Sequence, residues 1–187
     1  LPDQHKYILF FGFIRDYKGL DLLLKAMAEK EVKDLPVKVL IAGEFYTKPD
    51  PYYDLIKQLR IEDRVILKTN FIAESEVKNY FCASDLVVQP YKSATQSGVT
   101  QIAYHFNKPM IVTDVGGLAE IVPNGKTGYV VPPEDPIALS KSILTLLKDP
   151  LRCREFGDAG YLRYKGNFTW QKVSQKISER DESQFKM

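Results

Sequence analysis

The sequence has few of the side chains that form cross-links or bind metals: its 187 residues include only two cysteines and two histidines. Cys82 and Cys153 lie far apart and form no C-x-x-C motif, so the sequence indicates neither a disulfide framework nor a zinc site. A low cysteine content is typical of proteins in a reducing compartment. We therefore expect a cytoplasmic protein without a bound metal.

The sequence also lacks an excess of one charge and a long apolar run. Its 26 Lys and Arg residues against 24 Asp and Glu leave a net charge of +2, with no basic arm that would indicate nucleic-acid binding. No apolar run approaches the roughly 20 residues needed to cross a bilayer, and the first residues do not resemble a signal peptide. These absences argue against a nucleic-acid partner and against a membrane span.

Short apolar runs alternate with amphipathic stretches along the chain, and a 44% hydrophobic content suffices for the core of one α/β domain. The expected strands are Tyr7–Gly12, Val37–Ala42, Arg64–Leu67, Leu86–Gln89, Met110–Thr113 and Gly128–Val131. The expected helices are Leu20–Met27, Asp54–Leu59, Glu74–Cys82, Val99–Phe106 and Pro136–Leu147. Strands separated by helices predict right-handed crossovers. The fold class is therefore α/β, a Rossmann-like, doubly wound parallel sheet of about six strands.

The chain divides into three parts by its pattern. Residues 1–6 are interpreted as a linker remnant, residues 7–150 as the Rossmann-like domain, and residues 151–187 as C-terminal helices. The last expected helix, Thr169–Ile177, is capped by its first residue and would pack towards a domain that precedes this chain. The chain begins without methionine and soon reaches an apolar strand, which we expect of an excised domain.

Turns of small residues follow the expected strands, at the sheet edge where parallel sheets bind ligands. Ser97, Gly98 and Val99 open one helix, and Gly116-Gly117 precedes another. A helix start exposes unpaired amides and the positive end of the helix dipole, so a phosphate or diphosphate is the expected ligand. Two helix starts side by side would form one anion site, to which the Ser97 hydroxyl could add a donor.

The loop after the first strand supplies positive charge to the same edge. Arg15 and Lys18 could reach a diphosphate as charge-assisted donors, or could be solvated loop charges. Gly12 makes the turn before them, and Gly19 would let a ligand approach the backbone at the helix start.

Five ordered motifs carry a resemblance to a known family. They are Leu9-Phe10-Phe11-Gly12 with Arg15 to Asp21, Val39 to Glu44, Val65 to Leu67, Ala83 to Pro90, and the run from Thr113 to Val131 containing TDVGGLAEIV and GKTGYVV. Together they resemble the C-terminal, nucleotide-sugar-binding domain of GT-B glycosyltransferases of the retaining family 4 (group 1), over roughly residues 7–147. The resemblance implies one half of a two-domain enzyme, with residues 7–150 as its donor-binding domain.

The resemblance also implies an activity. The full-length protein would transfer a hexose-type sugar from a UDP- or GDP-sugar to a glycan or lipid-linked acceptor, which an N-terminal domain would bind. The nucleotide-sugar donor would be its substrate rather than a tightly bound cofactor, and no metal is expected. Peripheral contact with the inner face of the membrane is a further hypothesis for the full-length protein.

Particular residues take roles by the same resemblance. Arg15 and Lys18 would stabilise the leaving diphosphate, although Phe13 stands where the family often has its basic residue. Phe71 and Ile72 would lie where main-chain groups meet the base, and an equally good interpretation makes both of them core residues.

Two acids of the family are missing. The glutamates that approach the donor sugar and the ribose are replaced by Ala94 and Ile102. Gln96 and Gln101 are the nearest amides that could substitute, and Gln96 is the better placed of the two. Two alternatives stay open: half of a nucleotide-sugar 2-epimerase, which resembles the same two-domain architecture but would need acid/base carboxylates and histidines that this half does not supply, or a non-catalytic nucleotide-binding module, which the missing acids support.

Overall fold

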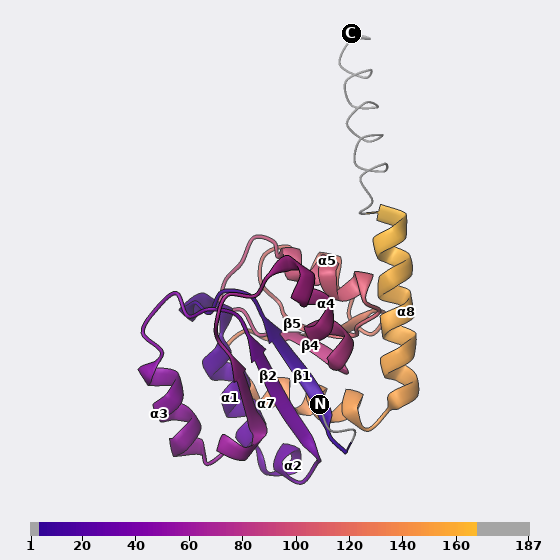
Figure 1. Ribbon diagram of the computed structural model, residues 1–187. Coiled ribbons are helices and arrows are strands. Elements are labelled where there is room, and N and C mark those ends of the chain that lie inside the picture. The colour runs from indigo at the N-terminus through magenta and orange to yellow at the C-terminus, as the bar shows by residue number, and fades with distance from the viewer. Residues whose placement is uncertain (1–3, 168–187) are drawn as a thin grey trace, which may run out of the picture.

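The computed structural model describes residues 4–167, which are built around a six-stranded parallel sheet (Figure 1). Its strands are β1 (Lys6–Phe11), β2 (Val37–Ala42), β3 (Val65–Lys68), β4 (Leu86–Gln89), β5 (Met110–Thr113) and β6 (Gly128–Val131). They lie in the order β3-β2-β1-β4-β5-β6, and all neighbouring strands are parallel. This confirms the predicted doubly wound fold. The order reverses between β1 and β4, which is where such sheets open a crevice for ligands.

Helices connect the strands. They are α1 (Leu20–Ala28), α2 (Lys30–Lys33), α3 (Asp50–Leu59), α4 (Glu74–Ala83), α5 (Gly98–His105), α6 (Leu118–Ile121), α7 (Pro136–Leu147) and α8 (Pro150–Asn167), with the 3-10 turns η1 (Asp16–Lys18) and η2 (Glu62–Arg64). The expected start of α3 at Asp54 is wrong by four residues, because Pro51 has a backbone angle suited to the first helical turn. The expected strand start at Arg64 is also wrong, since this residue ends η2 and its guanidinium donates to the carbonyl oxygens of Lys33 and Leu35.

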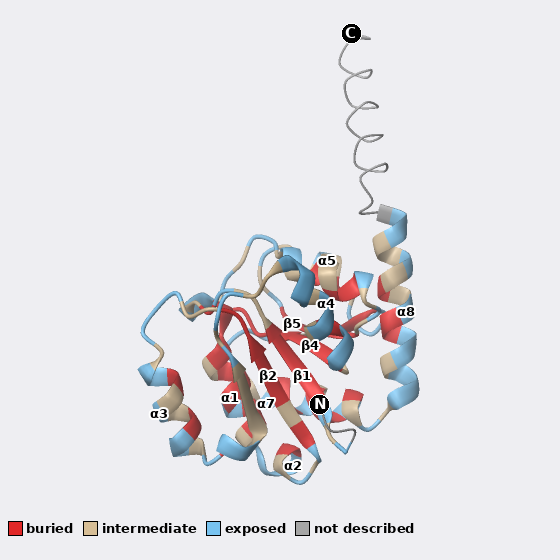
Figure 2. Ribbon diagram, viewed as in Figure 1, coloured by how far each residue is buried: buried red, intermediate tan, exposed pale blue. Residues whose placement is uncertain are grey.

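Alternate strand residues face the two sides of the sheet, and each side has its own helices. Ile8 and Phe10 pack into the cluster under α1, α2, α3 and α7, whereas Leu9 packs into the cluster under α4, α5 and α6. The four central strands β2, β1, β4 and β5 are mostly buried between these layers, as Figure 2 shows, whereas the edge strand β3 is half-buried. Continuous apolar strands are the expected consequence of a sheet covered on both faces.

The last described helix, α8, packs along α5, as Figure 1 shows at the side of the sheet. Gly160 makes this close approach possible, because a Cβ atom there would overlap the ring of Tyr104. The helix predicted at 169–177 lies outside the described residues. Among residues 4–167, no helix has both the length and the hydropathy that a membrane span requires.

Candidate functional site

The loops after β1 and β4 meet at the reversal of strand order. Gly19 has a φ of +69° and is buried against Pro90, so that a Cβ atom would overlap the Pro90 carbonyl oxygen. The amide of Lys92 donates to the Tyr17 carbonyl oxygen over 2.7 Å, which ties the same two loops together. Gly19 therefore has a packing role, because it lets one loop lie on the other, and its approach to a ligand stays a prediction.

Lys18 is held in this junction with most of its side chain buried. The residue is 9% exposed, and a Cβ atom built on Gly12 would be 3.0 Å from Lys18 Nζ. The ring centroid of Tyr91 is 5.9 Å from the same nitrogen. Within residues 4–167 no carboxylate pairs with Lys18. Burial, and then the charge of Arg15, lowers the pKa of Lys18 from 10.5 to about 8.

Arg15 lies at the same edge but on its outer side. Its guanidinium carbon is 3.8 Å from the centroid of the Tyr46 ring, a cation–π contact. The two loops that carry these residues are joined by a β-bridge between Ile14 and Phe45 and by a 3.0 Å hydrogen bond from the Tyr46 amide to the Ile14 carbonyl oxygen. Arg15 is thus half-buried and fixed where β1 and β2 end.

The N-terminus of α5 faces the junction. Ser97 is its N-cap, and within residues 4–167 the amides of Gly98 and Val99 have no hydrogen-bond acceptor. A Cβ atom on Gly98 would meet nothing within 4 Å, whereas the Val99 side chain is 3.9 Å from a Cβ placed on Gly12. A buried unpaired cation and a helix start with free amides therefore flank the same glycine, which is the arrangement that binds a phosphate.

The second glycine turn has a different role from the one predicted. The sequence predicts two helix starts side by side, and the structure does bring the two loops together. However, the Gly117 amide donates to the Thr95 carbonyl oxygen over 2.9 Å, and a Cβ on Gly116 would overlap the Ala94 carbonyl oxygen. Because α6 is a single turn, this segment supports the β4–α5 loop rather than offering Gly117 to an anion.

A buried polar network lies beneath Ser97, and the sequence analysis did not assign it a role. Gln89 Nε2 donates to Ser97 Oγ over 2.6 Å and to the Tyr91 hydroxyl over 3.1 Å, while Thr100 Oγ1 donates to Gln89 Oε1 over 2.8 Å. Gln89 is 1% exposed. The sequence does contain a signal for this network, because a glutamine that ends an apolar strand needs hydrogen-bond partners when it is buried.

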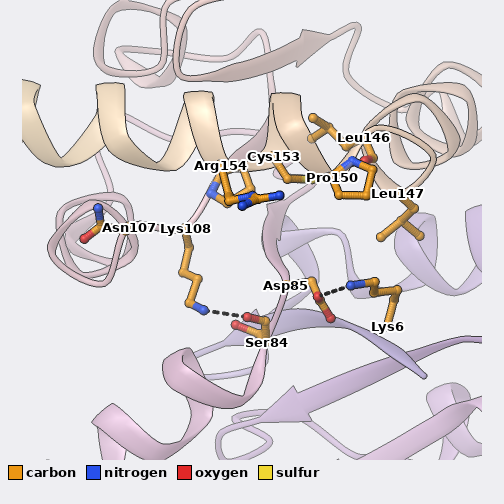
Figure 3. Close-up of a pocket in the computed structure, with 11 residues that line it drawn as sticks. Lys6, Ser84, Asp85, Asn107, Lys108, Leu146, Leu147, Pro150, Cys153 and Arg154 are labelled. Atoms are coloured by element: carbon orange, nitrogen blue, oxygen red, sulfur yellow. Dashed lines mark hydrogen bonds and ion pairs between the residues drawn. The ribbon is translucent and has the colours of Figure 1, made fainter. Parts of the chain in front are cut away.

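A separate hollow of about 370 Å³ lies at the opposite, amino-terminal edge of the sheet (Figure 3). Its two lysines are already engaged: Lys6 pairs with Asp85 over 3.0 Å, and Lys108 Nζ donates to the Ser84 carbonyl oxygen over 2.7 Å. Arg154 also lines this hollow. These lysines tie the starts of β1, β4 and β5 together, and Arg154 is exposed, whereas Lys18 at the other edge is a largely buried cation.

Comparison with known proteins places the chain in a family. The family described as "Glycosyl transferases group 1" matches residues 1–163. The chain belongs to the group 1 glycosyl transferases. It is 28% identical over 185 residues to D-inositol 3-phosphate glycosyltransferase 1 of Catenulispora acidiphila, an alignment that covers 95% of this chain and 44% of that protein.

Two solved structures share the fold. The C-terminal domain of the group 1 glycosyl transferase LpcC from Francisella tularensis matches with a TM-score of 0.80 and 21% identity, covering 89% of this chain and 87% of that one. Anabaena HepE, solved in complex with UDP, matches with a TM-score of 0.84 and 21% identity, covering 96% and 49%. The chain thus spans about half the length of HepE and of the Catenulispora protein.

Phe71 and Ile72, the two residues of this group 1 chain that were predicted to lie near the base, differ in burial. Phe71 is 72% exposed beyond the end of β3, so its interpretation as a core residue is wrong. Ile72 is half-buried and packs against the cluster under α4 and α5, as a core residue does. The exposed aromatic ring thus lies at the same edge of the sheet as Lys18.

Packed residues occupy the two positions at which the sequence predicts that the family's acids are missing. Ala94 is half-buried with its carbonyl oxygen against Gly116, and Ile102 packs against the core cluster. Gln96 is exposed, and its Cγ is 3.8 Å from a Cβ placed on Gly117. Gln101 lines a hollow of about 270 Å³ between α5 and α8, so the two amides lie in different surroundings.

Proposed function

We propose that this chain is the donor-binding half of a retaining glycosyltransferase, which transfers a hexose-type sugar from a UDP- or GDP-sugar to a glycan or lipid-linked acceptor. The observation that carries the proposal is the largely buried side chain of Lys18, whose ammonium has no carboxylate partner within residues 4–167, beside the free amides of Gly98 and Val99. A buried cation is costly unless an anion compensates it, so the donor diphosphate is its natural partner. The family membership and the UDP complex of HepE support the same ligand.

The chemistry follows from the charges. When the bond between sugar and diphosphate breaks, negative charge grows on the departing phosphate oxygens. Lys18 and the two amides are fixed before the reaction begins and face that charge, so they stabilise the transition state without reorganisation. Arg15 adds positive charge from the outer side of the loop. Since cations and a helix start supply this stabilisation, the proposed mechanism uses neither a metal nor a tightly bound cofactor.

The remaining parts of the proposal concern the whole protein. Residues 7–150 are the donor-binding domain, residues 1–6 are a linker remnant, and the acceptor is bound by an N-terminal domain of the full-length protein. Phe71 and Ile72 lie on the base side of the donor. The full-length protein acts in the cytoplasm, with peripheral contact to the inner face of the membrane.

Gly98 offers a test of the phosphate position that leaves the fold intact. A Cβ atom at Gly98 meets no atom of the described chain, so Gly98→Ala should unfold at the wild-type temperature or slightly above it. If a phosphate lies against this backbone, the added methyl weakens nucleoside diphosphate binding by about tenfold, or about 1.4 kcal/mol. Isothermal titration of the 187-residue chain with UDP and GDP measures the effect.

Gly166→Ala is the matched control. Gly166 also faces open space, but it lies on α8, so its substitution should leave binding unchanged and the unfolding temperature at or slightly above that of the wild type. Equal affinities of wild type and Gly98→Ala for both diphosphates would place the phosphate elsewhere. Absence of diphosphate binding by the wild type would overturn the proposed function itself.

A non-catalytic nucleotide-binding module remains the second candidate, because Ala94 and Ile102 stand where the family has its two acids. In that case, and in the proposed one, affinity rests mainly on the phosphates. Hydrolysis of a panel of nucleotide sugars by the full-length protein separates the two, since a module that only binds releases no sugar.

The missing ribose carboxylate predicts weak discrimination against deoxyribonucleotides. A site built around a buried carboxylate rejects a ligand that lacks the hydroxyl by several kcal/mol, because its acceptor is left unpaired. Ile102 has no such acceptor, so titrations with a nucleoside diphosphate and its 2′-deoxy analogue should differ by less than roughly a hundredfold, about 2.7 kcal/mol. A larger preference would show that another group, such as Gln101, contacts the ribose.

A further inference from the structure

Tyr91 stands between the two elements that would hold the diphosphate. Its hydroxyl is 3.2 Å from Ser97 Oγ at the start of α5, and its ring lies beside the ammonium of Lys18. The backbone of this tyrosine is also fixed, because Thr113 Oγ1 donates to its carbonyl oxygen over 2.6 Å. The residue is 3% exposed. Tyr91 is therefore held by more contacts than packing of a loop tyrosine requires.

Counting donors and acceptors fixes the direction of the hydrogen bond between Tyr91 and Ser97. Gln89 Nε2 donates one hydrogen to each of the two hydroxyl oxygens. If Ser97 donated to Tyr91, the buried phenol hydrogen would have no acceptor within residues 4–167, which is costly. The arrangement without a buried unsatisfied donor therefore has Tyr91 donating to Ser97.

This direction has a consequence at the surface of the site. Ser97 Oγ accepts from both Gln89 and Tyr91, so both of its lone pairs are occupied. Its own hydrogen is the remaining bonding group, and Ser97 is half-buried at the open N-terminus of α5. The hydroxyl can thus act only as a donor towards a ligand. Burial raises the pKa of Tyr91, so the phenol keeps the hydrogen that this arrangement needs.

We propose that Tyr91 is a positioning residue for donor binding: together with Gln89 it holds Ser97 Oγ so that the Ser97 hydroxyl donates to the distal phosphate of a nucleoside diphosphate. The inference rests on the proposed function, because it takes the diphosphate as the ligand at α5. It assigns a part of the preference for a diphosphate over a monophosphate to one hydroxyl and to the network behind it, in addition to the contacts of Lys18 and the free amides.

The test compares a nucleoside diphosphate with the monophosphate of the same nucleoside, in titrations of the full chain. The dissociation constant of the monophosphate divided by that of the diphosphate measures the contribution of the distal phosphate alone. Ser97→Ala should reduce this ratio by about fivefold to tenfold, the scale of one hydrogen bond. Tyr91→Phe keeps the ring beside Lys18 and should reduce the ratio by about threefold. In the double variant the loss should equal that of Ser97→Ala, because Tyr91 acts through Ser97.

Two variants separate positioning from stability. Ser97→Thr retains the hydroxyl and should keep the ratio. Tyr104→Phe removes a hydroxyl that bonds Thr127 and the Ile121 carbonyl oxygen, so it loses a comparable buried network away from the loop. It should lower the unfolding temperature without changing the ratio.

The possible outcomes distinguish a failure of this inference from a failure of the proposed function. An unchanged ratio in Ser97→Ala overturns the inference whether or not Tyr91→Phe folds, and so do additive losses in the double variant. Wild-type binding of neither nucleotide would instead refute the proposed function. Diphosphate binding with no preference over the monophosphate would leave the proposed function standing and remove the inference.

Discussion

Replacing Lys18 with methionine is expected to weaken nucleoside diphosphate binding by about 1.5 to 3 kcal/mol, the range for a charged hydrogen bond. This loss corresponds to about 10- to 150-fold in the dissociation constant. Binding of the nucleoside alone should change little, because the ammonium lies at Gly12 near the start of α5, where the proposal places the diphosphate. Titrations with a diphosphate and with its nucleoside measure both quantities, and equal losses would mean that the diphosphate lies elsewhere.

The same substitution should stabilise the free protein. The folded-state pKa of Lys18 is lowered, so the charged form costs free energy in the folded state at neutral pH. This cost is fully present below pH 8 and is relieved as the pH rises towards the ordinary lysine pKa of 10.5. Methionine removes the cost while filling the space, and we expect about 1 kcal/mol of added stability, within the range for such substitutions. Thermal unfolding at pH 7 without ligand measures it.

Lys108→Met is the matched control for both effects. Burial lowers the pKa of Lys108 as well, but its amine donates to the Ser84 carbonyl oxygen at the opposite edge of the sheet. Its loss should destabilise the protein and leave diphosphate binding unchanged. Stabilisation by Lys108→Met, or destabilisation by Lys18→Met, would contradict the view that Lys18 is an uncompensated charge.

The fold was predictable because the sheet is covered on both faces. Val37–Ala42 is an almost unbroken apolar run, and the structure places β2 over the same residues. Short helices carry less information. Residues 30–33 contribute one fully buried side chain, Val32, so their pattern is too brief to show a helical period and α2 was not predicted. The start of α3 depended on Pro51, whose effect is local and leaves no periodic signal.

The site was predictable only as a set of loops. The position of Lys18 after a glycine turn indicated a phosphate contact, but its burial depends on Pro90 and Tyr91, which come from a distant part of the chain. For the same reason, the sequence could not show that the Thr95 carbonyl oxygen accepts from the Gly117 amide. The packing of the loops on one another determines such pairings, and the local sequence does not show how the loops pack.

The affinity for a nucleoside diphosphate is expected to fall as the pH rises above 8. A pKa of about 8 means that the free protein begins to lose the Lys18 charge there, whereas a bound diphosphate holds the proton and raises this pKa. Binding then requires proton uptake, and the dissociation constant should rise about tenfold between pH 7 and pH 9, by the linkage of binding to one ionisation. The second ionisation of the ligand's terminal phosphate is complete in this range, so it does not produce the change.

Three variants make this pH profile specific. Lys18→Met has no group that titrates at this position, so its weak binding should stay constant over the same range and provide the baseline. Arg15→Met removes the second cause of the lowered pKa and should move the midpoint to higher pH, because the positive charge of Arg15 opposes protonation of Lys18. Lys108→Met should retain the wild-type midpoint, since its amine is engaged at the far edge of the sheet. A flat wild-type profile, or the same slope in Lys18→Met, would mean that Lys18 does not contact the diphosphate. A midpoint that Arg15→Met leaves unchanged would show instead that burial alone sets the ionisation of Lys18, and that Arg15 acts on the donor independently.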